Sequence, residues 1–554
     1  MKTLPRALGF AAAGLAQAMS IAAPWNGQPQ WWLQMLSLAA LVWLLDGLRG
    51  VPAAVSDEAA ARARAAARAA GAASAEAGGG RGAWRAGFFF GWLFATAWLC
   101  GTFWWLFVSM HTYGGLAAPL AALAVLLLAA GLGLYYAFAC LLFTAFAPAR
   151  PIGGAVFFAA LWTLAELLRG HWFTGFPWGA GGYAHVDGPL SVYAPWIGVY
   201  GIGAVSAAVA ALAALALRDL RMRAAAAPLG TALALLFVPV IVVVLRGTPA
   251  DDVARSAGRL DVELLQGNIP QDEKFVPGSG IATALRWYGE RLQAATGALV
   301  VTPETAVPLL PAELPRDYLE AIAARYASGQ QAAIIGLPLG DAAGYSNSVI
   351  GFRPRGADLY RYDKHHLVPF GEFIPGLFRW FTDLLNIPLG DFTPGSLGQP
   401  PFVWKGQRIA PNVCYEDLFG EEIGAGFTSD EGAPTILLNM SNIAWFGDTV
   451  AIDQHLAISR MRALEFQRPM VRATNTGATV VIDYRGYVTA ALPRLTRGVL
   501  KAEVEGRTGR TIYAQWVSRF GLWPLWGLTL LVMLATLLLR RLRAAPANPS
   551  VFPG

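Results

Sequence analysis

Cysteine, histidine and charge are all scarce in this chain. Of its 554 residues, three are cysteine and six are histidine, and only 14% are charged, whereas 55% are hydrophobic. So low a charge content excludes a soluble enzyme of this length and indicates an integral membrane protein. The formal net charge of +6 does not indicate nucleic-acid binding, because the basic residues are scattered over short loops rather than gathered on one face.

The scarce cysteines and histidines also limit the chemistry that the chain can perform. Cys100 and Cys140 lie within long apolar runs, which leaves Cys414 as the one cysteine of the polar region. It has no partner there for a disulfide bond and is therefore either an inert buried thiol or a reactive one. The histidine pair at 365–366 and His455 lack further ligands at metal-site spacing, so the sequence predicts no metal and no other cofactor.

Long apolar runs predict membrane-spanning helices, each of which needs about 20 mostly apolar residues. Eight runs qualify, seven before a long polar region and one after it. Their even number puts both termini on one side, and the basic residues after the second, fourth and sixth runs and in "RRLR" at 540–543 predict that this side is the cytoplasm. The runs are 6–23, 31–48, 86–110, 117–147, 152–168, 190–217, 226–245 and 520–539.

These runs divide the chain into four predicted parts. The parts are a membrane domain at 1–246 with an Arg/Ala-rich cytoplasmic loop at 49–85, a periplasmic domain at 247–515, a final span at 516–543 and a cytoplasmic tail at 544–554. The N-terminus leaves an alternative open. Lys2 and Arg6, followed by apolar residues and "AQA" at 16–18, also fit a secretory signal peptide that is removed.

The polar region alternates strand-like apolar runs with helical periodicity at 281–296, 314–327 and 452–467, which predicts an α/β domain. Its reactive side chains follow the strands. Glu304 comes after "LVVTP" and Cys414 after "RIAPNV". Open α/β sheets form their sites where strands end, so we expect these side chains to meet.

A reactive Cys414 needs a cation and a base, because the acidic residues beside it would only raise its pKa. Lys364 follows an extended run, Glu372 lies eight residues further on, and Glu304 stands between prolines. Taken singly, Glu304 could be a turn residue and Lys364 a solvated charge. Taken together, they predict a Glu–Lys–Cys set at three strand ends.

This set and its flanking sequences resemble the nitrilase superfamily, and the chain as a whole resembles a membrane-embedded family within it, the apolipoprotein N-acyltransferases. The stretches that carry the resemblance include "LLQGNIPQDEKF", "VTPETAVP", "YDKHHLVPFGEFIP", "CYEDLFG", "NMSNIAWFGDT" and "RMRALEFQRPMVRATNTG". The resemblance implies a polytopic α-helical membrane domain of about eight spans plus a nitrilase-like αββα sandwich on the outer side. It implies a monomer in the bacterial inner membrane, with the catalytic domain facing the periplasm.

The resemblance also implies the reaction. An acyl chain would pass from a membrane phospholipid, through a thioester, to the N-terminal amine of the diacylglyceryl-cysteine of apolipoproteins. Cys414 would be the nucleophile, Glu304 the general base and Lys364 the electrophilic stabiliser. Supporting roles fall to three further residues: Glu372, Tyr415 and Glu416.

Substrate contacts are predicted at four aromatic residues. Where the family often has a tryptophan, this chain has Phe275, and Trp445 lies in one of the matching stretches. Phe378 and Phe381 belong to an apolar stripe in "GLFRWFTDLLNIPLG", which is either a membrane-dipping arm or an ordinary core helix.

The loop after the fifth run holds further aromatic and charged residues. Trp172, Phe173 and Trp178 fit an interfacial aromatic belt. Glu166 and Arg169 would orient a lipid headgroup or pair with each other, and we favour the structural role.

Two other functions use the same features. A membrane-tethered amidase would use the same three residues with water as second substrate. A non-enzymatic lipoprotein-binding or transport protein would carry ionisable residues within several spans, and most of the spans have none.

Overall fold

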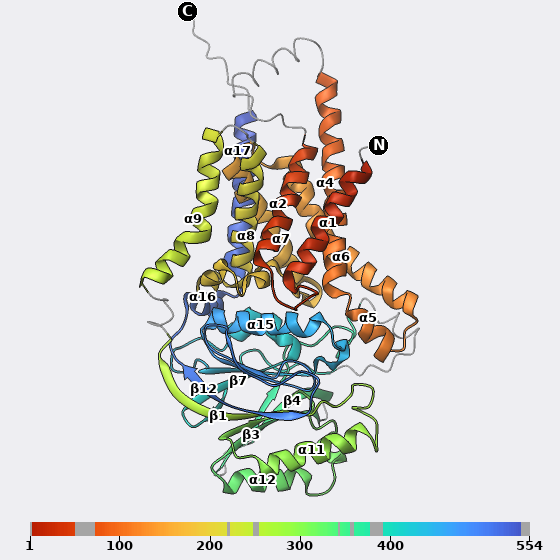
Figure 1. Ribbon diagram of the computed structural model, residues 1–554, viewed down its shortest axis with the longest axis vertical. Coiled ribbons are helices and arrows are strands. Elements are labelled where there is room, and N and C mark those ends of the chain that lie inside the picture. Colours follow the sequence, from red (N-terminus) through yellow and green to blue (C-terminus); the bar gives the residue numbers. More distant parts are fainter. Residues whose placement is uncertain are drawn as a thin grey trace, which may run out of the picture.

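The structure is a computed structural model that describes residues 3–49, 73–218, 222–246, 254–341, 344–354, 359–376 and 392–544. A bundle of long helices lies against an α/β part built of strands and helices (Figure 1). Helix α1 (Thr3–Ile21) begins, and helix α17 (Trp523–Ala544) ends, at the end of the bundle remote from the strands.

The bundle is built from apolar helices, which satisfy their backbone hydrogen bonds internally as a lipid environment requires. Seven helices in the described part of the chain are long and apolar enough to cross a membrane. The first predicted run, 6–23, forms α1, which packs in the bundle but is not apolar enough to be among these seven. The other long helices are α2 (Trp31–Leu48), α4 (Ala73–Phe103), α6 (Ala118–Phe146), α7 (Pro151–His171), α8 (Ala194–Arg218) and α9 (Met222–Arg246).

Short helices connect the long ones on the side that faces the strands. Helix α4 begins well inside the predicted loop at 49–85, and residues 50–72 of that loop lie outside the described residues. The short helices are α5 (Leu106–Val108), η1 (Ser109–Tyr113), η2 (Trp172–Thr174), η3 (Gly181–His185) and η4 (Pro189–Tyr193).

The α/β part contains two six-stranded sheets, ordered β12-β1-β2-β3-β4-β5 and β11-β10-β9-β8-β7-β6. Parallel strands form the centre of each sheet, and antiparallel strands form its edges. The first sheet contains β1 (Ser256–Gln266), β2 (Leu299–Val301), β3 (Ala332–Asp341), β4 (Gly344–Phe352), β5 (Tyr360–Asp363) and β12 (Gly498–Arg507). The second contains β6 (Phe402–Trp404), β7 (Gln407–Val413), β8 (Ile436–Ser441), β9 (Met470–Thr474), β10 (Val480–Ile482) and β11 (Val488–Ala491).

Helices cover the outer face of each sheet. One apolar core lies between the sheets, a second lies under α11 (Gly280–Ala294) and α12 (Tyr318–Ser328), and a third lies under α15 (Val450–Phe466) and α16 (Ile512–Phe520). The prediction of a helical membrane region with an αββα sandwich is therefore confirmed. The remaining short helices are η5 (Pro311–Glu313), η7 (Cys414–Leu418), α14 (Gly420–Gly424) and η8 (Ile443–Phe446).

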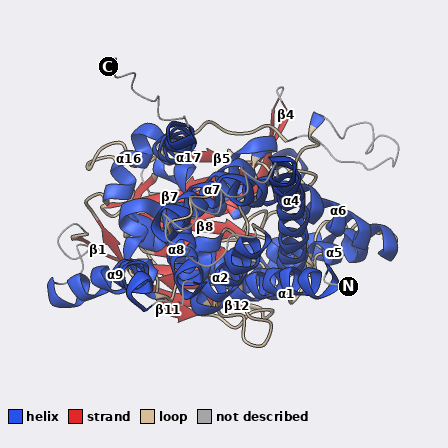
Figure 2. Ribbon diagram, turned by 90° about the horizontal axis from the view of Figure 1, so that it is seen from above, coloured by secondary structure: helices blue, strands red, loops and turns tan. Residues whose placement is uncertain are grey.

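Helix α15 joins the sandwich to the bundle. It lies between the second sheet and the long helices (Figure 1), and the bundle stands over the strands when the molecule is seen from above (Figure 2). Gln454 on α15 accepts hydrogen bonds from the indole N–H of Trp105 at 3.0 Å and of Trp178 at 2.7 Å. The two parts of the molecule therefore share a buried, hydrogen-bonded interface.

Candidate active site

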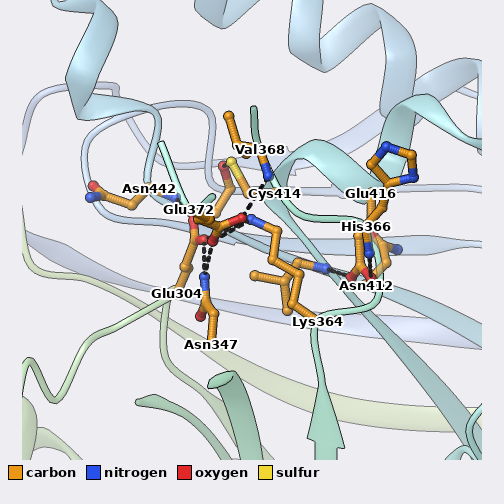
Figure 3. Close-up of polar contacts among 12 residues, drawn as sticks. Glu304, Asn347, Lys364, His366, Val368, Glu372, Asn412, Cys414, Glu416 and Asn442 are labelled. Carbon is orange, nitrogen blue, oxygen red and sulfur yellow. Dashed lines mark hydrogen bonds and ion pairs between the residues drawn. The ribbon is translucent and has the colours of Figure 1, made fainter. Parts of the chain in front are cut away.

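Three strand ends bring the predicted reactive residues together (Figure 3). Glu304 lies three residues beyond β2, Lys364 directly follows β5, and Cys414 directly follows β7. Strands β2 and β5 belong to the first sheet and β7 to the second, so the site forms where the two sheets meet.

Glu304 is held by polar partners on both carboxylate oxygens. Its Oε1 accepts from Asn347 Nδ2 at 2.7 Å and lies 3.3 Å from Lys364 Nζ, and its Oε2 accepts from the backbone N–H of Asn442 at 2.8 Å. Burial alone would raise the pKa of Glu304, but the nearby lysine charges and these hydrogen bonds hold it below its ordinary value. Gly336 allows this arrangement, because a Cβ there would lie 2.4 Å from the carbonyl oxygen of Pro303.

Lys364 lies between two carboxylates. Its ammonium is 3.0 Å from Glu372 Oε1 as well as 3.3 Å from Glu304 Oε1, and Asn347 Nδ2 donates to both carboxylates. Burial would lower the pKa of Lys364, but the charges of Glu372 and Glu304 outweigh it and raise that pKa. Lys364 therefore remains a cation, and Glu372, whose Oε2 accepts from the backbone of Val368 at 2.8 Å, fixes its position.

Cys414 adopts a left-handed backbone conformation, with φ of 53°, at the point where β7 turns into η7. Non-glycine residues rarely adopt this conformation, and those that do are often found at functional sites. Its Sγ accepts a hydrogen bond from Ser441 Oγ at 3.3 Å. Burial, and then the negative charge of Glu304, raise the pKa of the thiol to about 12, so the resting group is a protonated thiol that needs a base.

Glu416, two residues after the thiol, organises the surrounding backbone. Its carboxylate accepts from the backbone N–H groups of Val413 at 2.5 Å and His365 at 2.6 Å, and from the hydroxyl of Tyr362 at 2.8 Å. These bonds tie the turn that carries Cys414 to the segment that carries Lys364. Burial nevertheless raises the pKa of Glu416 above its ordinary value.

Tyr415 points from the same turn toward the helical bundle. Its hydroxyl donates to the carbonyl oxygen of Gly175 at 2.9 Å, and its ring stacks against Phe176 with 6.3 Å between centroids. The residue beside the candidate nucleophile is thus fixed by the loop that follows α7.

A second polar cluster lies behind Cys414, and nothing in the sequence around Cys414 points to it. His455 on α15 contacts the carbonyl oxygen of Cys414 through Nε2 at 3.2 Å, and its Nδ1 lies 2.7 Å from Arg472 Nη2. Because a guanidinium only donates, Nδ1 accepts and Nε2 carries the proton that is donated to Cys414. Burial, and then the charge of Arg472, hold the pKa of His455 well below its usual range, so the ring is neutral. Arg472 and Ser459 also contact the buried carboxylate of Asp417.

Lys274 is another residue that sequence reasoning missed, although it lies in a stretch that carried the resemblance. Its side chain is buried, and its Nζ donates to the carbonyl oxygen of Glu304 at 3.2 Å. Burial lowers the pKa of Lys274 to about 8, against the opposing effects of Glu304 and Cys414. The site therefore holds a second cation, and unlike Lys364 it loses its charge slightly above neutral pH.

Of the four residues predicted to contact substrate, the structure describes two. Phe275 and Trp445 are 49% and 40% exposed, and Trp445 makes an edge-to-face contact with Tyr113 of η1. Both roles remain predictions. Phe378 and Phe381 lie outside the described residues, as does all of the predicted arm at 376–389 except residue 376.

The loop after α7 corrects one expectation. Trp172 and Phe173 are exposed, as an interfacial belt requires, but Trp178 is buried because its indole binds Gln454 in the interface between bundle and sandwich. Arg169 is buried and donates to the carbonyl oxygens of Phe176 at 2.6 Å and Trp178 at 2.7 Å. These bonds give Arg169 a structural role.

The described residues contain no group of three or more histidine, cysteine, aspartate or glutamate side chains arranged to hold a metal ion. The polar groups around Cys414 are instead bound to one another, as the contacts above describe.

The αββα sandwich with glutamate, lysine and cysteine at its strand ends defines a protein of the carbon-nitrogen hydrolase class. The Carbon-nitrogen hydrolase family model matches residues 278–513, and the model of the Apolipoprotein N-acyltransferase N-terminal domain matches residues 66–212. Among solved structures, a CN-hydrolase superfamily protein from Xanthomonas campestris matches 48% of this chain and 96% of its own, at 21% identity and a TM-score of 0.34.

Relatives along most of the chain give the particular family. An apolipoprotein N-acyltransferase of Verminephrobacter eiseniae is 55% identical over 533 residues, which cover 92% of each chain. One of Ralstonia nicotianae is 46% identical over 458 residues, which cover 81% of this chain and 84% of the relative. The chain belongs to the apolipoprotein N-acyltransferases, and it is a membrane acyltransferase that acts in lipoprotein N-acylation.

Proposed function

We propose that Cys414 carries the acyl chain as a thioester between a phospholipid donor and the lipoprotein amine. The observation that supports this most directly is the convergence of Glu304, Lys364 and a partly accessible Cys414 at three strand ends. A protonated thiol beside an ionised carboxylate and a permanent cation has what an activated nucleophile needs.

In the first half-reaction, Sγ of Cys414 attacks the ester carbonyl carbon of the phospholipid while Glu304 takes the thiol proton. Lys364 stabilises the negative charge that develops on the carbonyl oxygen, and Lys274 adds a second positive charge nearby. The bond between the acyl carbon and the glycerol oxygen then breaks, and that oxygen takes the proton back from Glu304. The products are a lysophospholipid and an acyl thioester on Cys414.

In the second half-reaction, the neutral α-amine of a diacylglyceryl-cysteine attacks the thioester carbon. Glu304 accepts one amine proton, the carbon–sulfur bond breaks, and the thiolate of Cys414 recovers that proton. Because thioesters are more reactive toward amines than oxygen esters are, the covalent step replaces one difficult exchange with two easier ones.

The acyl donor and the location follow from the chemistry of the substrates. An acyl chain in a bilayer is accessible to a site held against membrane helices, and Tyr415 is bonded directly to the loop that follows α7. We infer that a single copy of the chain works in the bacterial inner membrane with the sandwich in the periplasm. The basic residues at 218–223 and 540–543 support this orientation.

The thioester can be tested by mass spectrometry of the intact protein. After incubation with phospholipid alone, the protein should gain the mass of one acyl group, and neutral hydroxylamine should release it. Cys414→Ala should form no adduct, whereas Cys140→Ala, which changes a buried thiol of the bundle, should form it normally. An adduct that persists in Cys414→Ala would contradict the mechanism.

Discharge of the adduct separates the transferase from an amidase-like hydrolase. A diacylglyceryl peptide with a free amine should discharge it, and the N-acetylated peptide should not. Equal discharge by water with and without the amine would favour hydrolysis.

The orientation can be tested with reporter fusions. A periplasmic reporter inserted within 247–253 and a cytoplasmic reporter attached after Arg543 should both be active. A reporter placed in 50–72 should read as cytoplasmic, and a periplasmic reading there would overturn the assignment of spans.

A further inference from the structure

A hollow of about 260 Å³ with a mixed polar and apolar lining opens near the candidate active site. The turn that follows β1 forms one wall, the segment around Ala444 and Gly447 forms another, and Tyr113 of η1 closes the side toward the bundle. A water molecule occupies about 30 Å³ of liquid volume, so this hollow has room for part of a substrate.

Gln271 connects the hollow to the proposed base. Its Oε1 accepts from the side chain of Asn442 at 2.9 Å, and the backbone N–H of Asn442 donates to Glu304 Oε2 at 2.8 Å. The hollow therefore lies two hydrogen bonds from the carboxylate that would deprotonate the incoming amine.

One donor of a residue that lines the hollow lacks an acceptor. The side chain of Gln271 is only 6% exposed, and its Nε2 has no hydrogen-bond partner among the described residues. A buried donor without a partner costs about 1–3 kcal/mol relative to a satisfied one. A ligand that brings a carbonyl oxygen to Nε2 would recover that energy.

The charge of the hollow restricts which ligand fits. Asp272 is exposed and lines it, and none of the described residues that line it is lysine or arginine. A phosphodiester would be repelled by the carboxylate and would find no cation. Thr476 and Asn268 add polar groups that suit a peptide backbone, in a wall that also contains the apolar Pro270 and Leu495.

The acceptor has such a part. Its diacylglyceryl chains remain in lipid and its amine must reach Glu304, so the peptide that follows the cysteine needs a separate, polar path. Building on the function proposed above, we propose that the hollow binds this peptide segment. Gln271 Nε2 donates to one of its backbone carbonyls, and Asp272 favours a basic over an acidic side chain next to the cysteine.

The charge preference is measured on the preformed thioester. Diacylglyceryl peptides with lysine, serine or glutamate directly after the cysteine are compared by the rate at which they discharge it. The lysine peptide should react about threefold faster than the glutamate peptide, because the charge of Asp272 is exposed and screened. High salt should reduce this ratio.

Charge reversal should invert the preference. Asp272→Lys should favour the glutamate peptide, and Asp272→Asn should remove the difference. Glu290→Lys, an equivalent reversal at an exposed position of α11, should keep the wild-type ratio. Each ratio is taken within one variant, so a general loss of folded protein does not affect it.

Gln271 is tested by removing only its donor. Gln271→Glu keeps an acceptor for Asn442 but has no amide N–H. In Gln271→Glu, we compare the rate of discharge by the serine peptide with the rate of discharge by S-diacylglyceryl-cysteamine, which has no peptide. The ratio of the first rate to the second should fall about tenfold from its wild-type value. Gln515→Glu on α16 should not change this ratio.

The outcomes separate the subsite from the mechanism. Failure of the wild-type protein to form a thioester would refute the proposed function itself. A thioester that forms and discharges with unchanged peptide preference in Asp272→Lys would refute only the subsite. Asp272→Lys could instead change the rate of thioester formation from phosphatidylethanolamine relative to that from phosphatidylglycerol. This result would assign the hollow to the donor headgroup and would also overturn the proposal.

Discussion

The two sides of Cys414 differ in kind. On the thiol side, Glu304 and Lys364 form a charged pair whose groups can exchange or stabilise charge during a reaction. On the carbonyl side, His455 and Arg472 are fully buried, and the ring is locked as a neutral donor to the backbone. This comparison supports the proposal that the thiol-side residues perform the chemistry, while the carbonyl-side residues hold Cys414 in a conformation that its backbone would otherwise avoid.

The largest effects should come from the thiol side. Glu304→Gln keeps the side-chain size but removes the base, and Lys364→Met removes the cation that faces the oxyanion. Each should slow formation of the acyl adduct by about a thousandfold, as loss of a base or of oxyanion stabilisation commonly does. The rate is measured as the appearance of acylated protein after mixing with phospholipid. Adduct formation within tenfold of wild type would remove either residue from the mechanism.

Changes on the carbonyl side should have an intermediate effect. His455→Leu removes the hydrogen bond to the carbonyl oxygen of Cys414 and should slow adduct formation by about a hundredfold through misplacement of the thiol. His455→Gln retains an amide donor at a similar position and should recover most of this loss.

If His455 only stabilised the fold, the loss of activity in these two variants would follow their loss of stability. The unfolding temperatures of His455→Leu and His455→Gln should not differ in proportion to their rates of adduct formation. Because His455 stays neutral, the pH dependence of adduct formation should also be the same in His455→Gln as in the wild type. A transition between pH 5 and 8 that is present in the wild type and absent from His455→Gln would contradict the neutral state assigned to the ring.

The smallest effect concerns Lys274, which belongs to the thiol side but loses its charge slightly above neutral pH. Its pKa of about 8 lies below the ordinary lysine value, so the side chain is cationic below pH 8 and neutral above it. Adduct formation by the wild type should therefore fall as pH rises through about 8. Lys274→Met should be about tenfold slower at pH 7 and should lack this alkaline decline. A decline that persists in the variant would assign it to another group.

The sequence predicted the thiol side far better than the carbonyl side. Glu304, Lys364 and Cys414 each follow a recognisable apolar strand, so their meeting could be expected from the rule that strand ends form sites. Asn347 could not be anticipated in this way, because it lies within β4, whose small and polar residues do not read as a strand. Its bonds to Glu304 and Glu372 depend on pairing of β4 with β3 and β5.

Residues of the carbonyl side give even weaker local signals. From the sequence, His455 is a candidate only for metal binding, because no neighbouring residue indicates its contact with Cys414, 41 positions away. Arg472 lies in a strand that is buried throughout, where a charged residue runs against the usual pattern. A charged residue in a buried strand indicates a buried polar partner. The partners, Asp417 and Ser459, come from other elements and could not be identified from the sequence.

The apolar core of the bundle continues into the sandwich without a break, since Tyr415, Ile443, Ile452 and Met461 belong to the same cluster as Trp98, Trp162 and the other aromatic residues of the long helices. A shortened gene that encodes only the sandwich would therefore expose this apolar face of α15, together with Gln454 deprived of both tryptophans. Exposed patches of this kind cause proteins to aggregate. Efforts to obtain a water-soluble catalytic fragment should thus begin by redesigning the surface of α15 rather than by choosing a different point at which to cut the chain.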